Sequence, residues 1–459
     1  MRTGLARSAT LALAATIAGG GSALAITATE RTTRVASPPP ENGAPANASS
    51  DNLTFSGDER KARKMAFDSL ASNLVPGDTN GVSDVFVVHR GSRLGKLDGR
   101  VERLSARTGR SGAEANGESR NPSLGGDTRR PSRCVVFESR ATNLDRRDTS
   151  PDWDVYVRRG NRTTLVSPGR RDAHNGVVDG RCETVTFESR GRVYARDLKR
   201  NVTLSIGRGG NPDQQTNGKG VAYERGSQVY HRRFERVTRR TRSGRRIKQL
   251  SRRGRELLVS ASRSGRRGNG TSANPSADDN GYYVAFDSTA TSLCTRTCRG
   301  VSGDRNGRTR DVFRRTISRR APTRDRMQMV SYSYPVRAQG NGDSHSPAMS
   351  GAGENVVFVS EATNLRESRG IKARTTDPNG TQPDVFYWNF PRGRKTGAVS
   401  RESRTNEDRG TGQPWPAPVG TPAISNKANY IGWTSAAGVA GSQSAPGVAD
   451  IFVRFLGGR

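Results

Sequence analysis

Residues 65–88, MAFDSLASNLVPGDTNGVSDVFVV, contain the pattern that decides the predicted fold. A short alternating strand, 65–69, leads into a loop rich in Gly, Asn and Asp, and a second alternating strand resumes at Asp84. Two such strands joined by such a loop are typical of an antiparallel hairpin. We interpret the rest of the chain as copies of this hairpin and the segments that join them.

The hairpin recurs as an aromatic residue, any residue and Ser, followed later by Asp, an apolar residue and a second aromatic residue. Four further copies keep this pattern: Phe137 and Ser139 with 154–156, Phe286 and Ser288 with 311–313, Phe358 and Ser360 with 384–386, and Trp433 and Ser435 with 450–452. Two shortened copies have a tight turn in place of the loop: Phe187 with 192–194, and Tyr223 with 228–230. The sequence therefore contains seven hairpins.

A further strand that ends in an apolar residue and Ser follows nearly every hairpin. These strands are 101–105, 163–167, 202–205, 247–251 or 257–260, 327–331 and 398–400. A turn-rich segment such as 274–281, NPSADDNG, then precedes the next hairpin. Repeats of four strands without helical periodicity are typical of a β-propeller. We expect an all-β propeller of seven four-stranded blades; six blades is the alternative if the two short units are insertions or one merged blade.

The two ends of the chain supply complementary parts of one blade. The last hairpin stops at Phe455, and only four residues follow it. Residues 32–37, TTRVAS, have the apolar-Ser ending that the last blade lacks. We therefore expect this N-terminal segment to be the closing strand of a single propeller domain, 26–459.

Residues 1–25 have the layout of a secretory signal peptide. Arg2 and Arg7 precede an apolar run, 11–18, and Ala23-Leu24-Ala25 is a small-x-small cleavage site. The apolar run is too short to span a bilayer, so we expect no transmembrane segment. The mature protein is expected to be a monomer in the cell envelope or outside the cell.

Four cysteines in an exported chain indicate oxidised pairs. Cys134 and Cys182 precede the aromatic residues of consecutive hairpins, so neighbouring blades can bring them together. Cys294 and Cys298 lie four residues apart in one loop. We prefer the pairs Cys134 with Cys182 and Cys294 with Cys298, although four cysteines allow three connectivities.

The chain is strongly basic, with a net charge of +33 and 67 Arg among its 76 basic residues. Residues 232–267 carry fifteen basic residues against Glu235 and Glu256. Such a field attracts polyanions, for example anionic cell-surface polymers. The alternative is a compositional bias spread over solvated loops. Specific nucleic-acid binding is not expected, because no aromatic stacking residues are interleaved with the Arg run.

Three hairpin loops carry oxygen side chains at a spacing that suits calcium, with a Gly for the sharp bend and a distal Asp. The candidate ligands are Asp78, Asn80 and Asp84, then Asp304, Asn306 and Asp311, then Asp377, Asn379 and Asp384. A bidentate Glu is missing from each loop. The alternative is that Asn-Gly forms the turn while Asp bonds the backbone. No other cofactor is expected.

An Asp precedes the apolar-aromatic strand in five repeats, namely Asp84, Asp154, Asp311, Asp384 and Asp450. Because it recurs once per blade, we expect a structural role in which the carboxylate accepts backbone N–H groups at the strand entry. The four histidines are scattered, and no Gly-x-Ser-x-Gly elbow is present, so no catalytic constellation is visible.

Units such as 284–293, VAFDSTATSL, and 356–365, VVFVSEATNL, each followed by Asp-Val-Phe, resemble the WD-like repeats of TolB-type propellers of exported bacterial proteins. The resemblance covers essentially the whole mature chain. It implies a propeller that presents loops and a central channel to a partner, which for TolB is other envelope proteins. No partner-specific motif matches here.

Two functions follow from these observations. The first is an exported, non-catalytic scaffold that binds an envelope or extracellular protein or an anionic polymer. The second is a propeller enzyme, of glycoside hydrolase or lyase type, that acts on an acidic polysaccharide. A cluster of convergent, buried titratable residues at one mouth of the channel would favour the enzyme.

Overall fold

The computed structural model describes residues 33–35, 46–58, 62–90, 97–109, 112–170, 172–240, 242–294, 298, 303–318, 327–333, 338–365, 379–390, 398–403, 419–436 and 448–456. The expected signal peptide, residues 1–25, lies outside this part of the chain. Among the described residues, no helix is long and apolar enough to cross a membrane.

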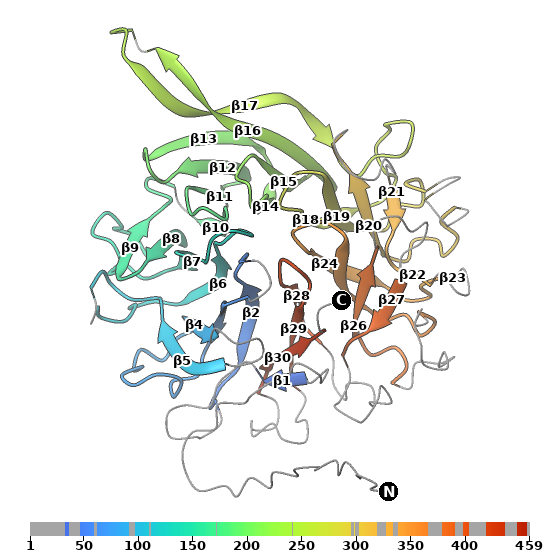
Figure 1. Ribbon diagram of the computed structural model, residues 1–459, viewed down its shortest axis with the longest axis horizontal. Helices are drawn as coiled ribbons and strands as arrows, with labels where there is room; N and C mark the ends of the chain where they lie inside the picture. The colour runs from blue at the N-terminus through green and yellow to red at the C-terminus, as the bar shows by residue number, and fades with distance from the viewer. Residues whose placement is uncertain are drawn as a thin grey trace, which may run out of the picture.

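Seven four-stranded antiparallel sheets surround a central channel, as the repeats predict (Figure 1). Blades 1 to 3 are β2 (Ser50–Phe55), β3 (Lys64–Ser69), β4 (Asp84–Arg90) and β5 (Leu97–Arg103); β6 (Ser119–Leu124), β7 (Val135–Ser139), β8 (Asp154–Arg159) and β9 (Arg162–Leu165); and β10 (Ala173–Val178), β11 (Thr184–Ser189), β12 (Arg192–Asp197) and β13 (Val202–Arg208). In each blade the first strand lies at the channel and the last lies outside.

Blades 4 to 6 have the same order. They are β14 (Gly210–Gln214), β15 (Gly220–Arg225), β16 (Gln228–Arg240) and β17 (Arg246–Leu258); β18 (Ser272–Ala277), β19 (Tyr283–Ser288), β20 (Asp311–Thr316) and β21 (Met327–Met329); and β24 (Ser344–Met349), β25 (Asn355–Ser360), β26 (Asp384–Asn389) and β27 (Ala398–Arg401). A small sheet of β22 (Tyr332–Ser333) and β23 (Ala338–Gln339) follows blade 5. The two short repeats thus form complete blades 3 and 4, and the six-blade alternative is excluded.

The N-terminal segment closes the ring. Blade 7 consists of β28 (Ala423–Ile424), β29 (Tyr430–Ser435), β30 (Asp450–Phe455) and, as its outer strand, β1 (Thr33–Val35). Arg34 lies opposite Val453 in this antiparallel pair. Strand β1 comes from the start of the chain and β30 from its end, so the ring is held shut by pairing between them.

One aromatic pair lies at the centre of every blade. In each pair the aromatic residue of the second strand stacks on that of the third, with ring centroids 5.6 to 6.4 Å apart. The pairs are Phe67–Phe86, Phe137–Tyr156, Phe187–Tyr194, Tyr223–Tyr230, Phe286–Phe313, Phe358–Phe386 and Trp433–Phe452. Strands such as β7, VVFES, are buried along their whole length because adjacent blades cover both of their faces.

Blade 4 carries a long two-stranded extension. Strands β16 and β17 have 13 residues each and stay paired out to Arg240 opposite Arg246. Figure 1 shows them passing the outer strands of blade 3 and projecting beyond the ring. The two alternative strands predicted here, 247–251 and 257–260, are therefore largely parts of one strand.

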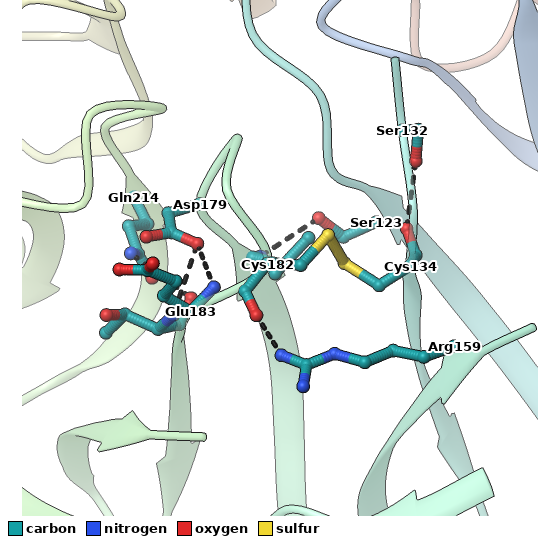
Figure 2. Close-up of a disulfide and its surroundings, with 10 residues drawn as sticks. Ser123, Ser132, Cys134, Arg159, Asp179, Cys182, Glu183 and Gln214 are labelled. Atoms are coloured by element: carbon teal, nitrogen blue, oxygen red, sulfur yellow. Dashed lines mark hydrogen bonds between the residues drawn. A yellow bond between two sulfur atoms is a disulfide. The ribbon is translucent and has the colours of Figure 1, made fainter. Parts of the chain in front are cut away.

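A disulfide joins blades 2 and 3 (Figure 2). Cys134 precedes β7 and Cys182 lies in the turn before β11, with their Cα atoms 6.0 Å apart. Gly125 leaves room for the bridge, because a Cβ there would lie 2.6 Å from the Cys182 Sγ. Cys294 and Cys298 form the second disulfide. Both pairs are those preferred from the sequence.

Candidate functional site

The strand order of the blades creates two faces. Neighbouring strands are antiparallel and run in order from the channel outwards. The turns after the first and third strands therefore open on one face, and the loops after the second strand open on the other. We call these the mouth face and the loop face; the candidate calcium loops belong to the loop face.

On the loop face, a ring of carboxylates joins each blade to the next. In blades 1 to 5, the acid after the aromatic residue of the second strand accepts two hydrogen bonds. One comes from an Asn side chain of its own inner strand, and the other from a backbone N–H of the next inner strand. The acids are Asp68, Glu138, Glu188, Glu224 and Asp287, at distances of 2.5 to 3.0 Å.

These carboxylates hold blades together. The inner-strand residues that bond them have left-handed backbones, with φ between 46° and 54°. Five of the six are Asn, a residue that tolerates this conformation. The ring was not predicted, although its signal is present in the sequence: the residue after the aromatic residue of the second strand is acidic in these five blades. A buried acidic cluster at this end of the channel is explained by blade joining.

In four blades, the Asp that begins the third strand has a repeated structural role, but through a different bond from the one expected; Asp450 begins the third strand of blade 7 in the same place. Its Oδ1 accepts the hydroxyl of a Ser after the outer strand, and that hydroxyl accepts the N–H of the residue after the Asp. The pairs are Asp84–Ser105, Asp154–Ser167, Asp311–Ser331 and Asp384–Ser403, with Gln228–Ser260 in blade 4. Ser403, and not Ser400, therefore occupies this position in blade 6.

The first candidate calcium loop already holds a positive side chain. Carboxylate oxygens of Asp78, Asp84 and Glu114 lie within 4.8 Å of one another. Nη1 of Arg103 lies among them, 2.8 Å from Glu114, 3.4 Å from Asp78 and 3.7 Å from Asp84. Asn80 donates to Asp84 at 2.8 Å, and its own oxygen accepts the N–H of a turn residue at 3.1 Å. The guanidinium occupies the place that a cation would need.

The third loop has an equivalent arginine. Arg401 lies opposite Phe386 as Arg103 lies opposite Phe86, and its Nη1 is 3.3 Å from Asp384. Asp377 lies outside the described residues, whereas Asn379 begins the described part of this loop. This loop also neutralises its buried Asp with its own cation.

The second loop has a methionine in place of the arginine. Met329 lies opposite Phe313 in the same register. Oδ1 of Asp304 and Oδ1 of Asn306 accept no hydrogen bond among the described residues. The amide of Asn306 donates to Asp311 at 3.0 Å. Calcium binding stays a prediction, and this second loop is the one whose oxygens fit it.

We predict that Arg103→Met destabilises the fold by about 3 kcal/mol, because it leaves buried carboxylates without their cation. Burial raises the pKa of Asp84 to about 6, against hydrogen bonds from Ser105 and Asn80 and the charge of Arg103. Without Arg103 this pKa rises further, so protonation relieves the loss as the pH falls. Urea unfolding should show a larger effect at pH 8 than at pH 5. Equal midpoints for variant and wild type at pH 8 would contradict this account; Arg107→Met, at an exposed position, is the control.

At the mouth face, backbone hydrogen bonds join the inner turns of successive blades. Each runs from an N–H of one turn to a carbonyl oxygen of the next. They are Gly57 to Gly125 (3.3 Å), Gly126 to Gly180 (3.0 Å), Gly180 to Thr216 (2.8 Å), Asn217 to Asp279 (3.2 Å), Asp279 to Gly351 (3.0 Å) and Gly351 to Asn426 (2.9 Å). The series connects blades 1 to 7 around the channel mouth.

The channel mouth is a polar cavity of about 440 Å³. Its charged lining residues are Arg129, Arg181, Lys219, Lys427, Asp127 and Asp279. Below it, a second cavity of about 280 Å³ lies between the inner strands of all seven blades. Leu124 and Met349 line that deeper part together with polar residues such as Asp213 and Gln214, and burial raises the pKa of Asp213 to about 7. The four basic residues against two acidic ones favour an anion at the mouth.

Asp279 is the acid at the mouth whose pKa is shifted. Burial raises this pKa, against hydrogen bonds from Thr216 and Asn426, and the nearby charge of Asp127 raises it further. The side-chain amide of Asn426 donates to Oδ2 of Asp279. A carboxyl with a raised pKa beside a second carboxylate is the arrangement of a general acid. The sequence analysis did not single out either Asp.

A groove of about 710 Å³ between blades 4 and 5 opens beside the mouth. Its basic lining residues are Lys219, Arg233 and Arg255, and none of its described lining residues is acidic. Arg233 belongs to β16 and Arg255 to β17, so the base of the extension forms one wall. Asn217, Lys219 and Asn280 line both the groove and the mouth cavity, which makes the two continuous.

His231 lies buried in the groove wall. Its Nε2 lies 2.9 Å from Nε2 of Gln215 and accepts a hydrogen bond from that amide. Burial, together with the charge of Arg233, lowers the pKa of His231 to about 3. The imidazole is therefore neutral in the folded protein at neutral pH.

We predict that His231 makes the fold sensitive to acid. Its folded pKa lies below the unfolded value, so its stabilisation is complete above about pH 6.5 and is lost as the pH falls towards 3. Between pH 7 and 4.5, wild type should lose about 3 kcal/mol of unfolding free energy relative to His231→Gln.

His174 serves as a control, because its effect on stability should depend on pH in the opposite direction. Its hydrogen bond with Glu138 raises its pKa, so its stabilisation is present at low pH and lost as the pH rises. In urea unfolding over the same pH range, His174→Gln should diverge from wild type in the opposite direction. A pH-independent difference between wild type and His231→Gln would show that residue 231 does not titrate on unfolding.

The outer part of the extension presents basic side chains without acidic ones, whereas Glu235 and Glu256 lie nearer the blade and pair with Arg253 and Arg225. We call residues 236–250 the arm, because their paired ends Arg236 and Leu250 lie just beyond the buried anchor Phe234. Arg236 pairs with Asp197 at 2.7 Å and ties the arm to blade 3. The outer basic side chains Arg239, Arg240, Arg242, Arg245, Arg246 and Lys248 are exposed, and the arm contains no Asp or Glu.

The four histidines do not assemble a catalytic group. His89, His174, His231 and His345 lie on β4, β10, β16 and β24, in four different blades. His89 and His174 each lie 3.4 Å from a Glu oxygen, and His345 bonds the neighbouring Ser346 at 3.0 Å. Ser346 donates its backbone N–H to Asp287, but among the described residues no hydrogen bond joins His345 to a carboxylate, as a catalytic triad requires.

Comparison with protein-family models and with curated proteins gave no match. Many solved structures resemble this chain at low identity, and three of them are described here. TolB from Acinetobacter baumannii is 10% identical over 67% of this chain and 61% of that chain, with a TM-score of 0.33. The acylaminoacyl peptidase of Pyrococcus horikoshii is 8% identical over 88% and 50%, with a TM-score of 0.43. The oligogalacturonate lyase of Vibrio parahaemolyticus is 10% identical over 90% and 99%, with a TM-score of 0.31.

This chain therefore spans less than two thirds of the TolB structure and half of the peptidase. The three proteins differ in what their names say they do, and every TM-score is below 0.5. We therefore infer function from the side chains of the mouth face.

Proposed function

We propose that this protein is an exported, non-catalytic propeller that binds an anionic polymer on its mouth face. The observation that carries the proposal is the gathering of basic residues at the channel mouth, in the groove and along the arm. Glu235, which lies between the groove and the arm in β16, is paired with Arg253 at 2.9 Å. Among the described residues that line the mouth and groove and form the arm, only Asp127 and Asp279 are acidic. The excess of basic residues on this face supports an anionic polymer as the partner.

The arm suits a long, flexible polyanion. Six residues beyond Phe234, at roughly 3.3 Å per residue, carry its charges about 20 Å from the blade. Exposed arginines can meet carboxylates or phosphates at many positions along a polymer, and each contact releases bound counterions. The affinity should therefore fall steeply with salt.

The test compares two variants with five neutralised charges each. The arm variant changes Arg239, Arg240, Arg242, Arg246 and Lys248 to Gln. The control changes Arg107, Arg146, Arg190, Arg192 and Arg308, which are exposed on the loop face, to Gln. Both lose the same net charge, so nonspecific attraction would weaken equally in the two.

Binding of alginate and of a glycerol-phosphate polymer is measured at 50 and 200 mM salt. We expect the arm variant to bind at least about 10-fold more weakly at 50 mM salt and with a shallower salt dependence, while the control stays near wild type. Equal losses in both variants, or no binding by wild type at 50 mM salt, would contradict the proposal. Binding of acidic proteins but of neither polymer would contradict it as well.

Asp279 supports a second candidate, an enzyme that cleaves an acidic polysaccharide. It lies in the mouth with Asp127 and four basic residues, and its pKa is raised by burial. A general acid with cations around it could protonate a leaving oxygen while the cations hold substrate carboxylates. Reducing ends or unsaturated products formed by wild type and abolished by Asp279→Asn would establish this candidate in place of the scaffold.

A further inference from the structure

We infer that the groove between blades 4 and 5 binds a single acidic sugar unit and is the recognition site for the polymer. This inference rests on the proposed function. It assigns a ligand class to a cavity of about 710 Å³, which is within the usual size range of small-ligand sites.

The charges of the groove suit a carboxylate. Lys219 reaches it from the inner turn of blade 4, and Arg233 and Arg255 reach it from the paired strands of the arm base. Two guanidinium groups favour a planar, bidentate anion, and a carboxylate has that geometry. The absence of acidic residues among the described lining residues leaves this positive charge uncompensated from within the groove.

Apolar surface beside these charges distinguishes the groove from a simple phosphate site. Tyr282, Leu257 and Ile317 line it together with the cations. A sugar ring has apolar C–H faces, which can pack on an aromatic ring and on aliphatic side chains while its acid group meets the arginines. A bare inorganic anion would make no use of these three residues.

Amide groups complete the set of contacts that sugar hydroxyls require. Asn217, Asn280 and Gln215 line the groove, and Gln215 is held by its hydrogen bond to His231. A Cβ at Gly281 would lie 2.6 Å from Nε2 of Gln215, so the glycine leaves room for that amide. His231 is a positioning residue here, because it orients the amide and is itself buried.

The neighbours of the groove allow a polymer to continue in both directions. On one side it shares Asn217, Lys219 and Asn280 with the channel mouth. On the other, Arg233 and Arg255 belong to the same two strands as the arm, with the Glu235–Arg253 pair between them. A recognised sugar unit can therefore belong to a longer chain, with the arm providing affinity and the groove providing selection.

Calorimetric titration of the whole chain with short probes tests the inference. The probes are uronate trisaccharides of the manno and galacto series, the corresponding neutral trisaccharides, and glycerol phosphate. We expect at least one uronate trisaccharide to bind about 30-fold more tightly than the corresponding neutral trisaccharide, because the neutral sugar lacks the carboxylate that makes the bidentate arginine contact. Glycerol phosphate should bind more weakly than that trisaccharide.

Two groove variants and one control separate the site from general charge. Arg233→Gln with Arg255→Gln should weaken the trisaccharide about 10-fold or more, and Tyr282→Ala should weaken it about 5-fold. The five-residue arm variant should leave trisaccharide affinity within about 2-fold while weakening the polymer. Thermal unfolding of each variant verifies that it is folded.

Failure of all uronate trisaccharides to bind overturns the inference. Equal binding of the neutral and the uronate trisaccharides overturns it as well, and so does tighter binding of glycerol phosphate than of the uronate trisaccharides. Equal losses in groove and arm variants overturn it too. If any of these results is obtained while polymer binding still depends on the arm, the proposed function remains valid and only the sugar site in the groove is rejected. Loss of polymer and trisaccharide binding together rejects both.

Discussion

A chain that begins at residue 38 should unfold at a markedly lower urea concentration than a chain that begins at residue 31. The longer chain keeps β1, and the shorter one removes it from the edge of β30. Three residue pairs and their backbone hydrogen bonds are then lost, at about 1 kcal/mol for each bond. The truncation also opens the ring, so we expect a total loss of about 3 to 5 kcal/mol, a large share of typical domain stability.

Trp433 provides a probe within the affected blade. It is fully buried in β29, next to β30, and stacks on Phe452. In the shorter chain, exposure of blade 7 to solvent should appear at lower urea than the loss of overall β-sheet circular dichroism. Coincident midpoints in the two chains would show that β1 does not hold the ring shut.

Gly180→Val should disrupt the channel mouth and cost about 3 to 5 kcal/mol, from a backbone clash together with two weakened inter-blade hydrogen bonds. A Cβ at this position would lie 2.5 Å from the carbonyl oxygen of Gly126 and 2.5 Å from the Thr216 Cγ2. The carbonyl is backbone, so blades 2 and 3 must move apart to admit the side chain.

Gly191 is the matched control in the same blade. Its φ is 67°, and a Cβ there meets nothing within 4 Å. Asn tolerates that conformation, so Gly191→Asn should cost less than about 1 kcal/mol. Urea midpoints of the two variants should therefore differ widely, and similar midpoints would show that the mouth ring tolerates a side chain.

The repeats predicted the blades because each blade carries the same local information. Phe67 and Phe86 stand at the centre of the hairpin read from the sequence, and the same pair recurs in every blade. The closing strand was predictable because residues 32–37 repeat the ending of other outer strands. Blades 3 and 4 kept their aromatic residues although their loops were short, which is why seven was favoured over six.

Contacts between blades were not predictable in the same way. Glu138 belongs to one repeat, and the N–H that it accepts belongs to Asn175 in the next, so no single repeat shows the bond. The arm illustrates a second limit. Its basic run was evident, but the register that makes two 13-residue strands from it depends on Phe234 and Leu250 packing against blade 3.

Whether a candidate calcium loop can accept a cation depends on one residue of the neighbouring outer strand. Asp78, Asn80 and Asp84 have the same residue types in the same order as Asp304, Asn306 and Asp311, and the second loop has one more residue before its last Asp. The side chain that decides between them comes from the outer strand, where the first blade has Arg103 and the fifth has Met329. Loop patterns alone could not identify this neighbour.

The two faces of the propeller differ in the charged residues that they carry. On the loop face, five acids join blades and four fix strand entries by hydrogen bonds within the protein. Basic residues on the mouth face adjoin two cavities and extend along the arm. Binding is therefore expected where charge is exposed, at the face opposite the repeated loops.

Hydrogen exchange with and without alginate tests this claim most directly. We predict slower exchange at amides of the arm, 236–250, and of the inner turns 215–219 and 279–282, with little change in the loop-face turns 190–191 and 226–227. Slowing confined to the loop face, or spread evenly over all seven blades, would contradict it.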